Sequence, residues 1–148
     1  MISPYNDEYF MKQALLEAQK AYDEGEVPVG AVVVANKQVI ARAHNLTEKL
    51  NDVTAHAEMQ AITAAANFLG GKYLKGCTLY VTLEPCTMCG GALYWSQLDK
   101  VVFAAPDEKR GAGQHAGIYH PKTVISSGIM ENDASELMKS FFQTKRED

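Results

Sequence analysis

Two short stretches of the sequence carry side chains that can bind a metal ion and move protons. The first contains His56 and Glu58, and the second contains Cys86 and Cys89. Imidazole nitrogen and thiolate sulfur are ligands that Zn²⁺ prefers in proteins. Three ligands at motif spacing, His56, Cys86 and Cys89, leave a fourth coordination position for water, as a catalytic zinc ion requires. We therefore predict one Zn²⁺ per subunit, bound by these three residues.

Glu58 follows His56 by two residues, so it lies close to the expected metal without being needed to bind it. A carboxylate in this place can accept a proton from a zinc-bound water and pass it on. The combination of His-x-Glu with Pro-Cys-x-x-Cys is the signature of zinc-dependent nucleobase deaminases. Because two separate motifs must both be present, the pattern is far more specific than a single Cys-x-x-Cys. It predicts Glu58 as the catalytic residue.

Two other interpretations of the cysteine pair are a redox pair and a structural zinc clip. A redox pair leaves the histidine–glutamate motif without a role, and a clip needs a fourth ligand. Cys77 precedes a predicted strand of about six residues, which places it about 20 Å from Cys86. We therefore interpret Cys77 as a small buried apolar residue. Three further histidines remain possible ligands although none has motif spacing: His44, His115 and His120.

Length, composition and charge limit the class of protein. A chain of 148 residues suits one hydrophobic core, so we expect residues 1–148 to form a single domain. No apolar run approaches the roughly 18 residues of a membrane span, and residues 1–8 lack the features of a secretion signal. We therefore expect a cytoplasmic protein without a membrane partner. The net charge of −4 counts mildly against nucleic acid, because phosphate binding requires a basic surface.

The hydrophobic pattern predicts an α/β protein with four helices and five strands. The helices are expected at residues 7–24, 55–69, 85–96 and after residue 133, and the strands at 31–34, 39–43, 78–83, 100–105 and 123–126. Strand, helix and strand in succession over residues 78–105 indicate a βαβ unit. Open α/β sheets place their sites where strand-to-helix junctions meet at one edge. We therefore expect two helix N-termini to assemble the zinc site.

The predicted starts of these helices rest on capping residues. Asn6 is expected to cap the first helix, and Thr54 is expected to cap the second. Pro85 suits the first position of the third helix. Residues 133–136 resemble a capping box that begins the last helix, with aspartate in the serine position.

Two polar segments and two pairs of aromatic residues have no role in the predicted zinc site. Asn45 begins an irregular stretch, and its residue type alone indicates a turn. Residues 106–120 form a long, glycine-rich loop, which in a compact domain is usually functional or disordered. Phe141 and Phe142 are adjacent in the last helix, so only one can face the core, and an exposed one could stack on a base or contact a subunit. Trp95, next to Tyr94, is expected in the core or in an interface.

Over nearly its whole length, the chain resembles the bacterial tRNA-specific adenosine deaminases of the cytidine deaminase superfamily. The resemblance is carried by residues 26–31, 55–58, 82–92, 101–103, 107–112 and 141–142. It implies a three-layer α/β/α sandwich around a five-stranded mixed sheet. It also implies a homodimer with the site near the interface.

The resemblance further implies roles for individual residues. Zinc would be bound by the predicted triad, and Glu58 would be the proton shuttle. Asn45 would hydrogen-bond a flipped base, and Asp107 would lie beside the ribose of the target or its neighbour. The backbone N–H of Ala57 would help to hold the hydroxide or the base.

The sequence departs from the family pattern at a few positions. Val53 replaces a usual proline, Pro106 replaces a usual arginine, and the loop after Gly113 is shorter. Residues 93–95 are similar to those of the related guanine deaminases. A free-base deaminase, acting on guanine or cytosine, therefore stays open as an alternative. A non-catalytic zinc-binding module is a further alternative.

The favoured function is hydrolytic deamination of adenosine to inosine at the wobble position of tRNA. Zinc lowers the pKa of water from 15.7 to about 7, so that Glu58 can accept its proton and later protonate the ring nitrogen and the leaving amine. The anticodon stem-loop is the expected partner, because its wobble base is already unstacked. In an acidic chain, RNA binding must depend on a local patch, and the candidate cations are Lys109, Arg110, Lys139, Lys145 and Arg146.

Overall fold

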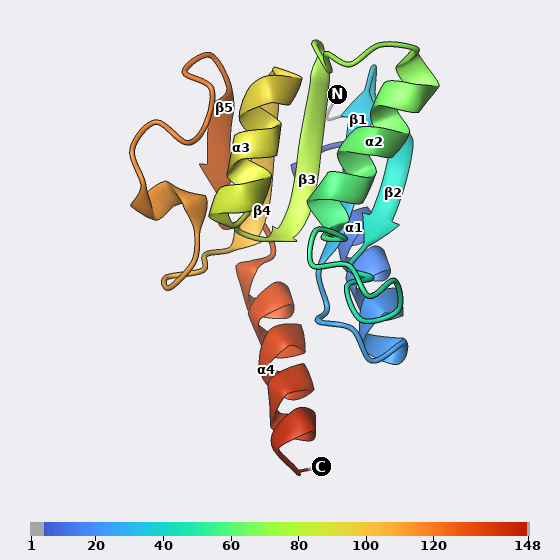
Figure 1. The fold of residues 1–148 in the computed structure, drawn as a ribbon, viewed down its shortest axis with the longest axis vertical. Coiled ribbons are helices and arrows are strands. Elements are labelled where there is room, and N and C mark those ends of the chain that lie inside the picture. The colour runs from blue at the N-terminus through green and yellow to red at the C-terminus, as the bar shows by residue number, and fades with distance from the viewer. Residues whose placement is uncertain (1–4, 148) are drawn as a thin grey trace.

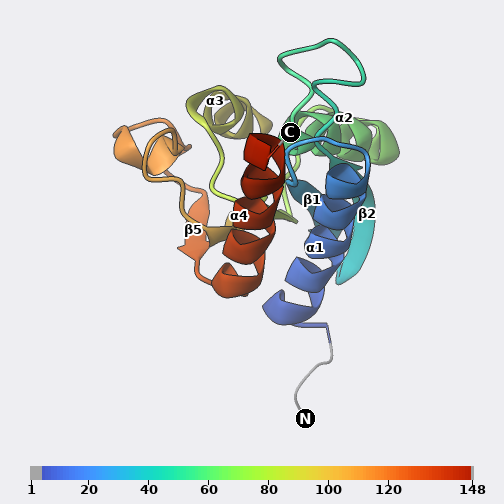
Figure 2. The same cartoon turned by 90° about the horizontal axis from the view of Figure 1, so that it is seen from below.

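The computed structural model describes residues 5–147 and shows a mixed β-sheet between two layers of helices (Figure 1). Side chains are described for residues 5–145, so the expected contact of Arg146 with RNA lies outside the described residues. Seen from below, helices cover both faces of the sheet (Figure 2). The predicted three-layer α/β/α sandwich is therefore confirmed.

The sheet has five strands in the order β2-β1-β3-β4-β5. They are β1 (Gly30–Ala35), β2 (Gln38–His44), β3 (Cys77–Leu83), β4 (Lys100–Ala105) and β5 (Val124–Ser127). Strand β1, the second in this order, is antiparallel to both β2 and β3, whereas β3, β4 and β5 are parallel. The helix between β3 and β4 completes the predicted βαβ unit.

Four helices flank the sheet, as predicted. α1 (Asp7–Asp23) and α4 (Glu131–Glu147) cover one face, and α2 (Ala57–Leu69) and α3 (Thr87–Ser96) cover the other (Figure 2). The N-termini of α2 and α3 meet at one edge of the sheet, beyond the end of β3, and α4 extends past the same edge (Figure 1). Over residues 5–147, no helix is long and apolar enough to cross a membrane.

The core has one part on each face of the sheet, because side chains of a strand alternate between its faces. In β1, Ala31 and Val33 pack in the cluster that includes α2 and α3, and Val32 and Val34 pack against α1. Burial on both faces explains the unbroken apolar run of this strand. α1 lies so close to the sheet that a Cβ at Gly30 would be 2.1 Å from the carbonyl oxygen of Ala14.

Thr54 does not cap α2, and that prediction was wrong. Its hydroxyl and its backbone N–H both donate to Asp52 Oδ1, at 2.7 and 2.8 Å. α2 begins three residues later, at Ala57, with His56 as the N-cap and no capping bond from the His56 side chain. Short polar side chains form local turns as readily as they cap helices, so residue type alone could not decide.

Pro85 does not begin α3, which starts at Thr87 with Cys86 as the N-cap. The chain is still extended at Cys86 because it pairs with a segment far along the sequence. The Pro85 carbonyl oxygen accepts a bond of 2.8 Å from Ala112 N, and Cys86 forms a β-bridge with Gly111. This tertiary pairing delays the start of the helix by two residues.

For the other two helices, the predicted cap of α1 is confirmed and the predicted start of α4 is wrong. The Asn6 side chain caps α1 by accepting a bond of 2.9 Å from a backbone N–H three residues later. α4 begins at Glu131, two residues before Asp133. The Met130 carbonyl already accepts a helical bond from Ala134 N, so Asp133 lies inside the first turn instead of opening a capping box.

Candidate functional site

The three predicted zinc ligands meet at the edge of the sheet where α2 and α3 begin. His56 is the N-cap of α2, Cys86 is the N-cap of α3, and Cys89 lies in the first turn of α3. His56 Nδ1 is 3.7 Å from Cys86 Sγ and 3.5 Å from Cys89 Sγ. All three ligand atoms lie within 4.8 Å of one another.

These distances fit a zinc ion. Tetrahedral zinc, with Zn–S of about 2.3 Å and Zn–N of about 2.0–2.1 Å, has N···S edges of about 3.6 Å. Among the residues that the structure describes, this triad is the one group of metal-binding side chains that comes together. Cys77 is buried at the start of β3 and outside the triad, as predicted, and no further histidine joins it.

The electrostatics of the triad favour a metal-binding thiolate. Cys86 Sγ accepts hydrogen bonds from the Cys89 thiol and the His56 ring, which lowers the pKa of Cys86 to about 4. The same contacts raise the pKa of His56 and of Cys89. A thiol must lose its proton to bind a metal, and the N-terminus of α3 stabilises the anion that results.

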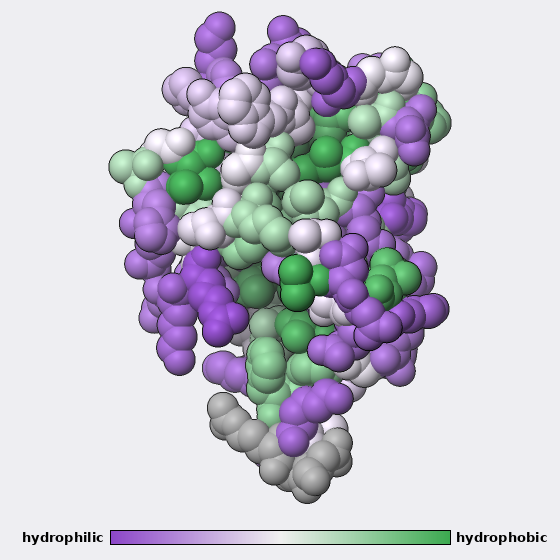
Figure 3. All heavy atoms as spheres, viewed as in Figure 1, coloured by the Kyte–Doolittle hydropathy of each residue, from purple (hydrophilic) through white to green (hydrophobic). Residues whose placement is uncertain are grey.

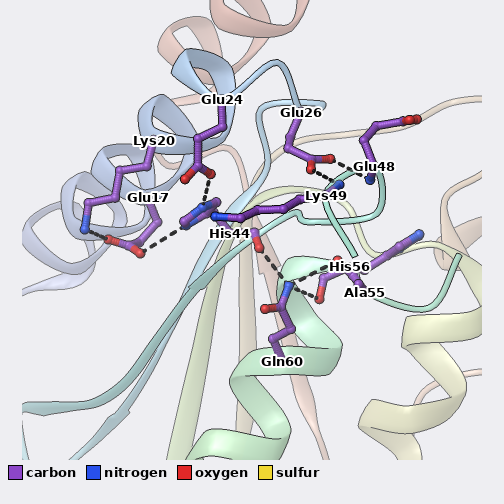
Figure 4. Close-up of polar contacts among 10 residues, drawn as sticks. All are labelled: Glu17, Lys20, Glu24, Glu26, His44, Glu48, Lys49, Ala55, His56 and Gln60. Carbon is purple, nitrogen blue, oxygen red and sulfur yellow. Dashed lines mark hydrogen bonds and ion pairs between the residues drawn. The ribbon is translucent and has the colours of Figure 1, made fainter. Parts of the chain in front are cut away.

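A glutamine holds the backbone around His56 (Figure 4). Gln60 Nε2, one turn into α2, donates to the carbonyl oxygens of His44 at 2.8 Å and Ala55 at 3.1 Å. These bonds connect the end of β2 to Ala55, the residue before the zinc ligand His56. Gln60 could not be recognised from the sequence, because a glutamine in a helix carries no sign of the carbonyl groups that it will contact.

Glu58 lies in the first turn of α2 and is 4% exposed. Burial is the main reason that the pKa of Glu58 rises to about 7. A general acid and base works best when its pKa is near the working pH. Glu58 therefore suits a role in which one carboxyl group first accepts and then donates a proton.

A pocket of about 810 Å³ brings the predicted substrate residues to the triad. Asn45, Ala57 and Asp107 line it together with His56, Cys86 and Glu58, although they come from three separate segments. Residues that sequence analysis did not assign to the site also line it: Val27, Val29, Thr47, Leu83, Glu84, Ser135 and Met138. The volume lies in the range of small-molecule sites.

Two of these predicted residues already have partners within their own loops. The Asp107 carboxylate accepts bonds from Lys109 N at 3.1 Å and Arg110 N at 3.0 Å, which closes a tight turn. Asn45 is buried, and its side-chain amide lies 3.5 Å from the Thr47 hydroxyl.

Three cations and one exposed aromatic ring lie at the mouth of the pocket. Lys109, Arg110 and Lys139 line it, and none of the three forms an ion pair in the part of the chain that the structure describes. Phe142 also lines the mouth and is 43% exposed, whereas Phe141 is buried. One phenylalanine thus faces the core and the other faces the pocket, as their adjacency predicted.

Lys145 was expected with these cations and does not line the pocket. Its Nζ lies 5.5 Å from the centre of the Phe141 ring, in a cation–π contact. α4 therefore brings Lys139 and Phe142 to the pocket and turns Lys145 away from it.

Comparison with known proteins agrees with this site. The chain matches the family model of the cytidine and deoxycytidylate deaminase zinc-binding region over residues 4–105. The tRNA-specific adenosine deaminase of Aquifex aeolicus (strain VF5) is 45% identical over 149 residues, which cover 94% of this chain and 95% of that protein.

Two solved structures illustrate the range of relatives. One, from biochemical and structural studies of A-to-I editing by tRNA:A34 deaminases, has a TM-score of 0.82 at 42% identity and covers 87% of this chain and 98% of its own. A guanine deaminase from Bacillus subtilis has a TM-score of 0.67 at 39% identity and covers 77% and 71%.

The match to the family model includes all three ligands and Glu58, and the similarity to the Aquifex protein extends over nearly the whole of both chains. The donor set and its geometry independently fit zinc. The chain therefore belongs to the cytidine and deoxycytidylate deaminase family, within its group of tRNA-specific adenosine deaminases.

Proposed function

We propose that this protein hydrolyses the amino group of adenosine at the wobble position of tRNA, giving inosine and ammonia. The observation that carries the proposal is the pocket itself. It is lined by Glu58 and by two of the three zinc ligands, His56 and Cys86, and its mouth has three cations, without an ion pair among the described residues, beside an exposed aromatic ring. Three lysine and arginine side chains that line this pocket offer an acidic chain local groups for binding phosphates.

The zinc ligands and Glu58 supply the chemistry. When bound by His56, Cys86 and Cys89, zinc lowers the pKa of a water molecule from 15.7 to about 7. There Glu58 would accept one proton of the water and donate it to N1 of the adenine ring as the water oxygen adds to C6, and it would then move the second proton of the water to the amino group, which leaves C6 as ammonia. Ala57 lines the pocket at the first position of α2, where a backbone N–H has no partner within the helix, and this N–H would help to hold the hydroxide or the base.

The residues of the mouth select the substrate. Asn45 hydrogen-bonds the flipped base, and Asp107 lies beside the ribose of the target or its neighbour. Phe142 provides a face on which a neighbouring base stacks. The wobble base of an anticodon loop is already unstacked, so its entry into the pocket costs little.

The assembly that we propose is a homodimer formed through the face of α2 and α3. Trp95 is 74% exposed, which rules out the core position considered from sequence, and Phe68 and Leu69 of α2 are also exposed. Apolar side chains gather in the middle of this face, with hydrophilic ones at its margins (Figure 3). Light scattering should give twice the mass of one chain for the wild type and a lower mass for Trp95→Glu. A monomeric wild type would contradict the dimer.

We further propose that residues 1–148 act as one deaminase domain in the cytoplasm, where its tRNA substrate is found. Activity of the purified chain alone on RNA tests the first part. Fractionation of cells followed by detection of the chain tests the second.

A panel of substrates tests the function itself. Zinc-loaded protein should convert the wobble adenosine of an anticodon stem-loop to inosine and leave free guanine and cytosine unchanged. The guanine deaminase alternative has a specific observation in its favour, the 39% identity to the Bacillus subtilis enzyme. Rapid turnover of guanine, without formation of inosine in RNA, would contradict the tRNA substrate and indicate a guanine deaminase.

A further inference from the structure

Two buried carboxylates lie against the backbone of two loops that line the pocket, and one of them, Glu84, also lines the pocket itself. Glu26 is 1% exposed and Glu84 is 9% exposed. In the described part of the chain, neither forms an ion pair with a lysine, arginine or histidine. Burying a carboxylate without such a partner is costly unless hydrogen bonds to it replace those of water. For both residues the donors are backbone N–H groups.

Glu26 holds the loop that begins with Asn45 (Figure 4). Its two oxygens accept bonds from Glu48 N at 3.0 Å and Lys49 N at 2.8 Å. These N–H groups lie at the start of a single helical turn, closed by a bond from Leu50 N to the Leu46 carbonyl. The first N–H groups of a helical turn have no partner within it, and Glu26 supplies one.

Glu84 holds the loop that contains Asp107 in the same way. Its two oxygens accept bonds of 2.9 Å from Asp107 N and Gly113 N. The loop wraps tightly around the carboxylate, because a Cβ at Gly111 would lie 2.3 Å from the Glu84 carboxyl carbon. The turn that presents Lys109 and Arg110 to the pocket lies between the two bonded residues.

We propose that Glu26 and Glu84 are positioning residues, each holding in place one of the two loops that contact the substrate. Glu26 positions residues 45–49, and Glu84 positions residues 107–113. The loops themselves are described by the structure, and only the identity of their ligand rests on the proposed function. Both carboxylates act through backbone that they hold, without touching the reacting atoms.

The test replaces each carboxylate by the amide of the same size. In Glu26→Gln and Glu84→Gln, one oxygen still accepts an N–H, but the new NH₂ group faces the other N–H and cannot accept from it. Glu17→Gln is the matched control, because Glu17 is also buried but bonds Lys20 and His44, away from the pocket. Gly111→Ala is a fourth variant, which displaces the second loop while leaving the Glu84 carboxylate intact.

Amide hydrogen exchange is the first measurement, and it needs no substrate. Exchange should become at least tenfold faster around residues 46–50 in Glu26→Gln, and around residues 107–113 in both Glu84→Gln and Gly111→Ala. Each variant should leave the other loop unchanged, and Glu17→Gln should leave both unchanged. Unaltered exchange in the loop, or faster exchange throughout the chain, would overturn the proposal.

Kinetics on the anticodon stem-loop is the second measurement. In the three loop variants KM should rise about tenfold while kcat stays within about threefold and zinc content stays unchanged. A fall in kcat for Glu84→Gln that Gly111→Ala does not reproduce would overturn the proposal for Glu84, since it would indicate a direct catalytic role. If wild-type protein forms no inosine, the proposed substrate fails, and the exchange measurements still decide whether these carboxylates hold the loops.

Discussion

On one side of the pocket, which we call the zinc side, His56, Cys86 and Cys89 come from the N-termini of two helices on the same face of the sheet. On the other, which we call the substrate side, two loops and α4 contribute residues that line the pocket. On the zinc side Cys89 and Glu58 are buried and His56 and Cys86 are half-buried, and the ligand atoms are held by helices that pack in the core. The substrate side carries the exposed cations and Phe142, and in each of its two loops a buried carboxylate accepts two backbone N–H groups.

This difference separates the two tasks of the enzyme. A metal site needs ligand positions accurate to a few tenths of an ångström, which rigid helix ends provide. A surface that admits RNA needs exposed charge and aromatic faces, which loops and a helix end provide. Changes on the zinc side should therefore abolish the chemistry, and changes on the substrate side should weaken binding and leave the chemistry intact.

The largest effect is expected from removal of a zinc ligand. Cys86→Ala and Cys89→Ala should each lose zinc and all measurable deamination. They should also unfold at lower temperature, because zinc stabilises only the folded state and ties α2 to α3. Metal analysis and thermal unfolding of the purified variants check this.

Cys77→Ala is the control for the ligand variants, because Cys77 is a buried cysteine outside the triad. It should keep a full complement of zinc. Loss of zinc from this variant would contradict the three-ligand site and favour a structural site with four ligands.

The next largest effect is expected for Glu58→Gln. The glutamine keeps the shape of the side chain but cannot carry protons, and loss of a general acid and base costs about 10²–10⁴-fold in rate. Zinc content and kcat should be measured on the same sample, and zinc should stay at the wild-type level. A zinc-loaded variant with a near-normal rate would rule out Glu58 as the proton shuttle.

A smaller effect is expected on the substrate side for Phe142→Ala. Stacking of one base on an aromatic ring contributes about 1–3 kcal/mol, so the Kd for the stem-loop should rise roughly 10-fold. Tyr73→Ala is the matched control, because Tyr73 is similarly exposed and does not line the pocket. Equal effects of the two substitutions would show that Phe142 makes no stacking contact.

The smallest effect is expected from neutralising Lys109 and Arg110 together as glutamines. Each phosphate contact contributes about 0.7 to the slope of log affinity against log salt concentration for single strands. The double variant should flatten the slope by about 1.4 while zinc content and fold stay unchanged. Salt titrations of stem-loop binding measure this.

Lys72→Gln with Lys75→Gln removes the same charge away from the pocket and is the control for the salt titration. This control should leave the slope near that of the wild type. If the affinity of the wild type for the stem-loop does not depend on salt, the substrate side makes no phosphate contacts.

The zinc side could be predicted from sequence because its determinants are local. Cys86 and Cys89 are three residues apart at a helix start, and His56 and Glu58 are two apart, so spacing alone puts each pair near the same point. The strands and the number of helices were likewise predicted from hydrophobic pattern, whereas the predicted starts of α2, α3 and α4 were wrong. The start of α3 was wrong by two residues, because pairing of Pro85 and Cys86 with residues 111–112 decides it.

The substrate side was decided by the tertiary structure. The Glu26 carboxylate meets N–H groups 22 and 23 residues away, and the Glu84 carboxylate meets groups 23 and 29 residues away. A glutamate has the same sequence appearance whether it faces water or holds a loop, so no pattern distinguishes these two from the rest. Local spacing determined the chemistry of this protein, whereas hydrogen bonds between distant segments determined where its loops present that chemistry to a substrate.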